Sequence, residues 1–166
     1  MITRILSLLL FFSASFSSNS QDIENGVYSC IKEKYKEKGS DWQLTCDSII
    51  FYMTDGADSI TKKMLLQKLN DSTWQKKIPE RLISDIQDIY VKRYGKSIVE
   101  TCFSYFSHRD GHEQKIEGEA GEFMGLVKRK ATHEEYITFF NELSEEFFMH
   151  PFYKYSFISW VMSAPR

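Results

Sequence analysis

Hydrophobic residues recur at helical spacing along most of the chain. Ile23, Val27, Ile31 and Tyr35 lie four residues apart, and Gly39 then ends the segment as a C-terminal cap would. Similar segments follow after polar breaks, and none shows the two-residue alternation typical of paired strands. The pattern predicts an all-α fold, a helical bundle or an orthogonal array of about six to eight helices with short connections.

Capping signals mark several of these helices. Pro79 suits the first turn of a helix, because the N–H that proline lacks has no partner there. Thr132 and Glu135 have the spacing of a capping box, in which each side chain accepts a hydrogen bond from the other residue's backbone. We therefore expect a helix to begin after Thr132 and to end at His150-Pro151.

Residues 112–130 give a weaker signal. Apolar residues occur there at helical spacing, but Gly118, Gly121 and Gly125 each cost a helix about 1 kcal/mol relative to alanine. The segment is either a weak helix packed closely against a neighbour or a partly ordered loop. We favour the helix.

The first twenty residues have a pattern of their own. Arg4 precedes an apolar run over residues 5–12, and small residues follow over 13–20. This order is typical of a secretory signal peptide, whereas a membrane-spanning helix needs about 20 consecutive apolar residues. We expect residues 1–20 to be cleaved, after Ser20 or a few residues earlier. Residues 21–166 then form a single helical domain in the periplasm or outside the cell, with no transmembrane segment.

Charge excludes one class of partner. The chain contains 21 basic and 23 acidic residues, interspersed along its length. A nucleic-acid-binding protein would carry a basic face, and the chain also lacks a polybasic cluster for anionic lipids. We therefore expect no nucleic-acid partner.

Three cysteines allow one disulfide and one free thiol. If the helices on either side of Gly39-Ser40 fold back on each other, Cys30 and Cys46 are offset by only about 4–5 Å along the helix axes. A disulfide spans Cα atoms about 4.4–6.8 Å apart, so we expect Cys30 to pair with Cys46. Cys102 lies in an apolar helical stripe and is expected to be an inert buried thiol.

No motif in the chain predicts a reaction. His108, His112 and His133 are the candidate metal ligands, because zinc binds histidines together with carboxylates. Asp110-Gly111 separates the first two histidines and interrupts the helical face that His-x-x-x-His requires. The chain has no Gly-x-Ser-x-Gly elbow and no phosphate-binding glycine loop. We predict no catalytic residue and no cofactor, with a metal-dependent hydrolase as a minor alternative.

Aromatic residues are concentrated near the C-terminus. Ten of the 25 residues from Tyr136 to Trp160 are aromatic. One helix face cannot bury neighbours such as Phe147 and Phe148 together, so these helices either lie centrally in the bundle or expose an aromatic surface. The residues expected in that binding surface are Phe140, Phe147, Phe148, Phe152, Tyr153, Tyr155, Phe157 and Trp160.

The sequence thus predicts an exported helical binding module that acts through its aromatic residues. The leading hypothesis is a protein partner, as for a periplasmic inhibitor or an immunity-type protein. The alternative is a carrier of a small apolar ligand held between helices, where the same aromatic residues would line a cavity.

The segments 90–94 and 105–111 carry a family resemblance. They read Tyr-Val-Lys-Arg-Tyr and Tyr-Phe-Ser-His-Arg-Asp-Gly. They resemble a bacterial periplasmic family of unknown function, in which an aromatic residue is followed further along by Phe-Tyr-x-Ser-Pro-x-Gly. The aromatic spacing and Gly111 match, whereas His108 and Arg109 replace the family's serine and proline. The resemblance implies a small exported helical protein and no particular activity.

Overall fold

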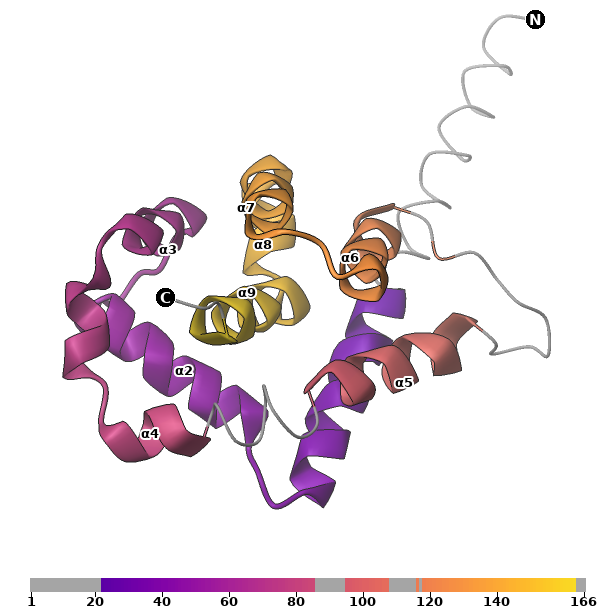
Figure 1. The fold of residues 1–166 in the computed structure, drawn as a ribbon, viewed down its shortest axis with the longest axis horizontal. Coiled ribbons are helices and arrows are strands. Elements are labelled where there is room, and N and C mark those ends of the chain that lie inside the picture. The colour runs from indigo at the N-terminus through magenta and orange to yellow at the C-terminus, as the bar shows by residue number, and fades with distance from the viewer. Residues whose placement is uncertain (1–21, 86–94, 108–115, 117, 164–166) are drawn as a thin grey trace, which may run out of the picture.

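The computed structural model describes residues 22–85, 95–107, 116 and 118–163 (Figure 1). Every regular element in these ranges is a helix, which confirms the all-α prediction. The first helix covers residues 22–37. It is followed by α2 (Trp42–Met53), α3 (Lys62–Gln67), the 3-10 helices η1 (Lys68–Asn70) and η2 (Ser72–Lys77), α4 (Glu80–Asp85), α5 (Gly95–Ser107), α6 (Gly118–Arg129), α7 (His133–Glu142), α8 (Glu145–Met149) and α9 (Pro151–Ser163).

Some predictions concern residues outside these ranges. The expected signal peptide over 1–20 lies outside the described residues, as do residues 90–94 and 108–111 of the family resemblance. Among the helices that the structure describes, none combines the length and the hydrophobicity needed to span a bilayer.

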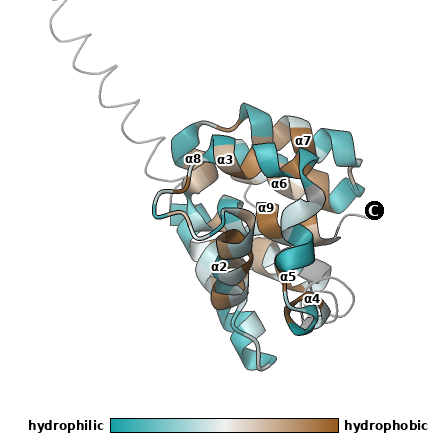
Figure 2. Ribbon diagram, turned by 90° about the vertical axis from the view of Figure 1, so that its left-hand side faces the viewer, coloured by the Kyte–Doolittle hydropathy of each residue, from teal (hydrophilic) through white to brown (hydrophobic). Residues whose placement is uncertain are grey.

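Helix α9 lies at the centre of the fold, with the other helices arranged around it (Figure 1). Figure 2 shows hydrophobic residues along α9 and many hydrophilic residues on the helices that surround it. A helix with apolar residues on most of its sides is stable in water only where neighbours cover those sides. The buried residues of α9 are Phe152, Tyr153, Tyr155, Ser156, Phe157, Ile158, Val161 and Met162.

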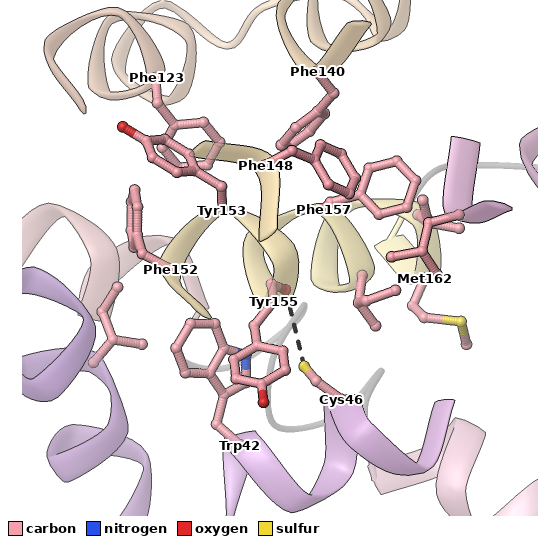
Figure 3. Packing of buried hydrophobic residues seen from close by; sticks show 14 of the residues in the cluster. Trp42, Cys46, Phe123, Phe140, Phe148, Phe152, Tyr153, Tyr155, Phe157 and Met162 are labelled. Atoms are coloured by element: carbon pink, nitrogen blue, oxygen red, sulfur yellow. Dashed lines mark hydrogen bonds between the residues drawn. The ribbon is translucent and has the colours of Figure 1, made fainter. Parts of the chain in front are cut away.

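Most of the expected aromatic surface is therefore the core. Phe140, Phe148, Phe152, Tyr153, Tyr155 and Phe157 are each at most 3% exposed. The Phe157 ring lies 5.2 Å from the rings of both Phe140 and Phe148, so α7, α8 and α9 meet through aromatic contacts (Figure 3). The surface prediction is wrong for these six residues, because the number of helices around α9 depends on tertiary packing. Phe147 and Trp160 are half-buried.

Hydrogen bonds satisfy the polar ends of two core tyrosines. The Tyr153 hydroxyl donates to Oε1 of Glu24 at 2.7 Å, and the Tyr155 hydroxyl donates to Oδ1 of Asp47 at 2.7 Å. Burial, reinforced by these carboxylates, raises the pKa of both tyrosines above the ordinary value. Both side chains therefore remain neutral donors that join α9 to the first helix and to α2.

The disulfide joins Cys30 to Cys102, with Cα atoms 5.8 Å apart. The predicted Cys30–Cys46 pairing is wrong, because α2 turns Cys46 toward α9 instead of toward the first helix. The Cys46 thiol is free and buried, and it lies 3.9 Å from the Tyr155 carbonyl oxygen (Figure 3). Burial raises the pKa of this thiol well above its ordinary value. Cys102, expected to be a free thiol, instead fixes α5 to the first helix.

The glycine-containing segment forms a helix, α6, over Gly118–Arg129. The helix prediction is therefore confirmed over these residues in preference to the loop. A Cβ atom at Gly121 would collide with the backbone carbonyl oxygen of Ile116, whereas a Cβ at Gly125 would meet open space. Gly121 thus permits a close backbone approach that any side chain would prevent.

Candidate ligand-binding pocket

A pocket of about 160 Å³ lies between α9 and the helices on one side of it. The first helix contributes Ile31 and Tyr35, and α5 contributes Val99. The remaining lining residues come from α2, α6, α7 and α9, and they are Trp42, Phe123, Val127, Tyr136, Ser156, Ser159, Trp160 and Ser163. Segments far apart in the sequence therefore line the same space.

Aromatic rings make up much of the pocket wall. Tyr35 and Trp42 form one pair, with ring centroids 5.8 Å apart and planes tilted by 33°. Tyr136 and Trp160 form a second pair, 5.7 Å apart with a tilt of 31°. Phe123 contributes a further ring, whose centroid lies 6.3 Å from that of Tyr136. A ring bound between these groups would find the tilted and edge-on neighbours that aromatic rings favour.

Three serines interrupt the largely apolar sequence of α9, which also contains Lys154, and all three serines line the pocket. Ser156, Ser159 and Ser163 are spaced by three and four residues, which places them on one face of the helix together with Trp160. Ser156 is the most buried of the three, at 8% exposed. The polar stripe of the central helix therefore coincides with the pocket.

Two of these serines form hydrogen bonds with neighbouring groups. The Trp42 indole N–H donates to the Ser159 hydroxyl at 3.0 Å, and the Cys46 sulfur lies 3.9 Å from the same oxygen. The Ser163 hydroxyl donates to the Trp160 carbonyl oxygen at 2.8 Å. These contacts fix the orientation of the two hydroxyls and leave part of their hydrogen-bonding capacity unused.

The pocket environment is neutral. None of the lining residues that the structure describes carries a charge. Burial raises the pKa of Tyr136, so its phenol also remains uncharged. Two further hollows, one beside Glu24 and His150 and one beside Lys62 and Asn141, have charged side chains in their linings and no comparable aromatic wall. A buried charge without a partner is costly, so the neutral pocket suits an uncharged molecule.

Of the eight predicted surface residues, Trp160 is the one that lines this pocket. Sequence reasoning missed Tyr35, Trp42, Phe123 and Tyr136, whose helical periodicity did not distinguish them from other core residues. It also missed the serines. Their common face on an apolar helix was the available signal, because a hydroxyl on such a face needs a polar partner or a wet cavity.

The described residues do not support the hypothesis of a metal site built from histidines. His133 is exposed, and its ring stacks on Trp160 with centroids 4.6 Å apart. His108 and His112 lie outside the described residues. Within the described part of the chain, no three histidine, cysteine, aspartate or glutamate side chains are grouped so that they could hold a metal ion.

The structure defines an all-α protein with one disulfide in its described residues and an aromatic, serine-containing pocket beside its central helix. Comparison of the chain with protein-family models, with curated proteins and with solved structures found no match.

Proposed function

We propose that this protein is an exported helical binding module that holds a small, mainly apolar ligand in the pocket beside α9. The observation that carries the proposal is the position of Ser156, Ser159 and Ser163, which face a space with otherwise aromatic and aliphatic walls. At the buried position of Ser156, packing alone would favour an apolar residue, because a buried hydroxyl needs a hydrogen-bond partner. Polar groups converging on an apolar pocket are typical of ligand-binding sites.

The pocket volume limits the size of the ligand. Pockets for drug-sized molecules measure about 300–1,000 Å³, and this pocket measures about 160 Å³. A cavity of about 150 Å³ lined by apolar side chains holds benzene. The pocket therefore holds a six-membered ring with one small substituent.

Two features support export. The N-terminal residues have the charged, apolar and small-residue order of a signal peptide. The Cys30–Cys102 disulfide suits an oxidising compartment, because thiols in the cytosol are kept reduced. Export to the periplasm or to the outside of the cell is part of the proposal.

The alternative of a protein partner, an inhibitor or immunity-type function, loses the surface on which it was based. Six of the eight aromatic residues assigned to that surface are buried. The large hydrophobic residues that are exposed in the described part of the chain are Leu44, Phe51 and Tyr105. Scattered exposed residues of this kind are normal on protein surfaces, so the small-ligand function is favoured.

Toluene binding to the purified protein tests the proposal. The indole N–H signals of Trp42 and Trp160 in a ¹H–¹⁵N NMR spectrum report on the pocket directly, because both rings line it. We expect toluene to shift these two signals and to leave that of Trp74, which lies outside the pocket, unchanged.

A variant that fills the pocket completes the test. Val99→Phe places a ring in the pocket and is expected to weaken toluene binding at least about tenfold, because the free volume holds only about one ring. Leu82→Phe, a matched change at a half-buried residue outside the pocket, should leave binding unchanged. Absence of toluene binding, or equal binding by both variants, would contradict the proposed function.

A further inference from the structure

The hydrogen-bonding groups of the pocket indicate which class of small molecule it takes. We infer that the ligand is a neutral monocyclic aromatic molecule with a hydroxyl group, that is, a simple phenol. This inference rests on the proposed function and adds three requirements to it: a ring, a hydroxyl and no charge.

The requirement for a ring comes from the walls. The pair Tyr35 and Trp42 and the pair Tyr136 and Trp160 reach the pocket from different parts of the fold. Aromatic pairs gain about 0.5–1.5 kcal/mol beyond the burial of their area, through offset and edge-to-face contacts. An aliphatic ring of the same volume would bury similar area without this gain.

The requirement for a hydroxyl comes from the unused capacity of the serines. The Ser159 oxygen accepts a hydrogen bond from the Trp42 indole N–H, so the Ser159 hydroxyl proton can be donated to a ligand. The Cys46 sulfur, 3.9 Å away, is a weak competing acceptor for that proton. The Ser163 proton is donated to the Trp160 carbonyl oxygen, which leaves the Ser163 oxygen as an acceptor. A ligand hydroxyl, which can both accept and donate, matches the two groups.

Ser156 points to the same conclusion. The residue is 8% exposed, and its hydroxyl opens onto the pocket without a hydrogen bond to another described residue. A serine hydroxyl has one proton to donate and two lone pairs to accept. A ligand hydroxyl can do both, whereas an ether or ketone only accepts and an ammonium group only donates.

The requirement for neutrality follows from the absence of charge among the described lining residues. A carboxylate or ammonium group in this pocket would lose its hydration without gaining an opposite charge. A phenol has an ordinary pKa near 10, like the tyrosine side chain, and is uncharged at neutral pH.

Four probes of similar size separate these requirements: phenol, toluene, cyclohexanol and benzoate. Dissociation constants at pH 7 are measured by NMR titration of the purified protein. One additional hydrogen bond is worth about 0.5–1.5 kcal/mol, so we expect phenol to bind about 2–10-fold more tightly than toluene. Phenol should also bind more tightly than cyclohexanol, and benzoate should not bind measurably.

Serine substitutions identify the hydroxyl partner. Ser156→Ala should weaken phenol binding about 2–10-fold and leave toluene binding unchanged. Ser48→Ala is the matched control, because Ser48 is a helical serine on α2 whose hydroxyl donates to the Leu44 carbonyl oxygen at 2.8 Å and which does not line the pocket. Ser163→Ala, at an exposed position on the same face of α9, gives a second variant that does not alter the core.

The outcomes distinguish this inference from the proposed function. If toluene binds as tightly as phenol, or if Ser156→Ala and Ser163→Ala leave phenol binding unchanged, the hydroxyl requirement is wrong while the proposed function stands. Tighter binding of cyclohexanol or benzoate than of phenol would overturn the requirement for a neutral aromatic ring. Absence of toluene binding would overturn the proposed function, and absence of phenol binding as well would overturn the inference with it.

Discussion

The indole N–H of Trp42 donates a hydrogen bond to the Ser159 hydroxyl over 3.0 Å. Trp42 is the first residue of α2, and Ser159 lies on the pocket-facing side of the central helix α9. The two residues are 117 positions apart in sequence, and both line the pocket. The bond therefore fixes one aromatic wall of the pocket to the helix that carries its polar groups.

Ser159→Ala should lower the free energy of unfolding by about 1–3 kcal/mol, because it leaves the buried Trp42 N–H without its acceptor. Urea denaturation measures the loss, and the Trp42 indole signal in the NMR spectrum should move. Ser159→Thr keeps the hydroxyl and should retain more of the stability. If Ser159→Ala is no less stable than Ser48→Ala, the hydrogen bond does not contribute as described.

Loss of the Cys30–Cys102 disulfide should destabilise the protein by about 4 kcal/mol in the chain-entropy model, because the bridge closes a loop with a sequence separation of 72. Urea unfolding of the oxidised and reduced protein measures this difference. Cys46→Ala, which removes the free thiol, should lose the same free energy of unfolding on reduction.

Peptide mapping under non-reducing conditions tests the pairing itself. We expect a fragment with Cys30 linked to a fragment with Cys102, and one free thiol per chain after denaturation. A Cys30–Cys46 linkage would contradict the structure.

The same substitution at two glycines of α6 should change the free energy of unfolding in opposite directions. Gly121→Ala should lower the free energy of unfolding by about 1–3 kcal/mol, because the new Cβ collides with the Ile116 carbonyl oxygen. Gly125→Ala should raise it by about 0.5–1 kcal/mol, because the position has space for a methyl group and alanine favours a helix. Urea denaturation of both variants tests this pair, and a stabilising Gly121→Ala would show that α6 does not approach Ile116 closely.

Stability should decrease as the pH falls below about 6.5, in part through His150. Nδ1 of its ring accepts from the Phe152 backbone N–H at 3.3 Å, so Nε2 carries the proton that meets Oδ1 of Asn25 at 3.0 Å. Burial lowers the pKa of His150 in the folded protein. His150 therefore binds a proton less readily in the folded state than in the unfolded chain. Its contribution to stability is present above the pKa that it has in the unfolded chain, and this contribution is lost as the pH falls below that value.

Thermal denaturation at pH 7.5 and pH 5 measures this effect. The unfolding temperature should be lower at pH 5, and His150→Gln should reduce the difference between the two values. His133→Gln, a change at an exposed histidine, is the control and should retain the full difference. An unchanged pH response in His150→Gln would show that other groups determine it.

Local signals in the sequence determined the type and several of the boundaries of the helices. Thr132 and Glu135 form the predicted capping box, in which the Thr132 hydroxyl accepts from the Glu135 N–H and Glu135 accepts from the Thr132 N–H. These signals are readable because they involve residues only three positions apart. The aromatic composition of the last helix, by contrast, allowed either a central position in the bundle or an exposed surface, and the structure shows the central position.

Only the tertiary structure decided which residues meet. The partner of Cys30 depends on the rotation of α2 and α5 about their axes, and helical periodicity does not specify that rotation relative to a distant helix. The same applies to the pocket. The spacing of Ser156, Ser159 and Ser163 placed them on one face of α9, but the aromatic residues opposite them come from segments far apart in sequence, brought together by packing around the central helix.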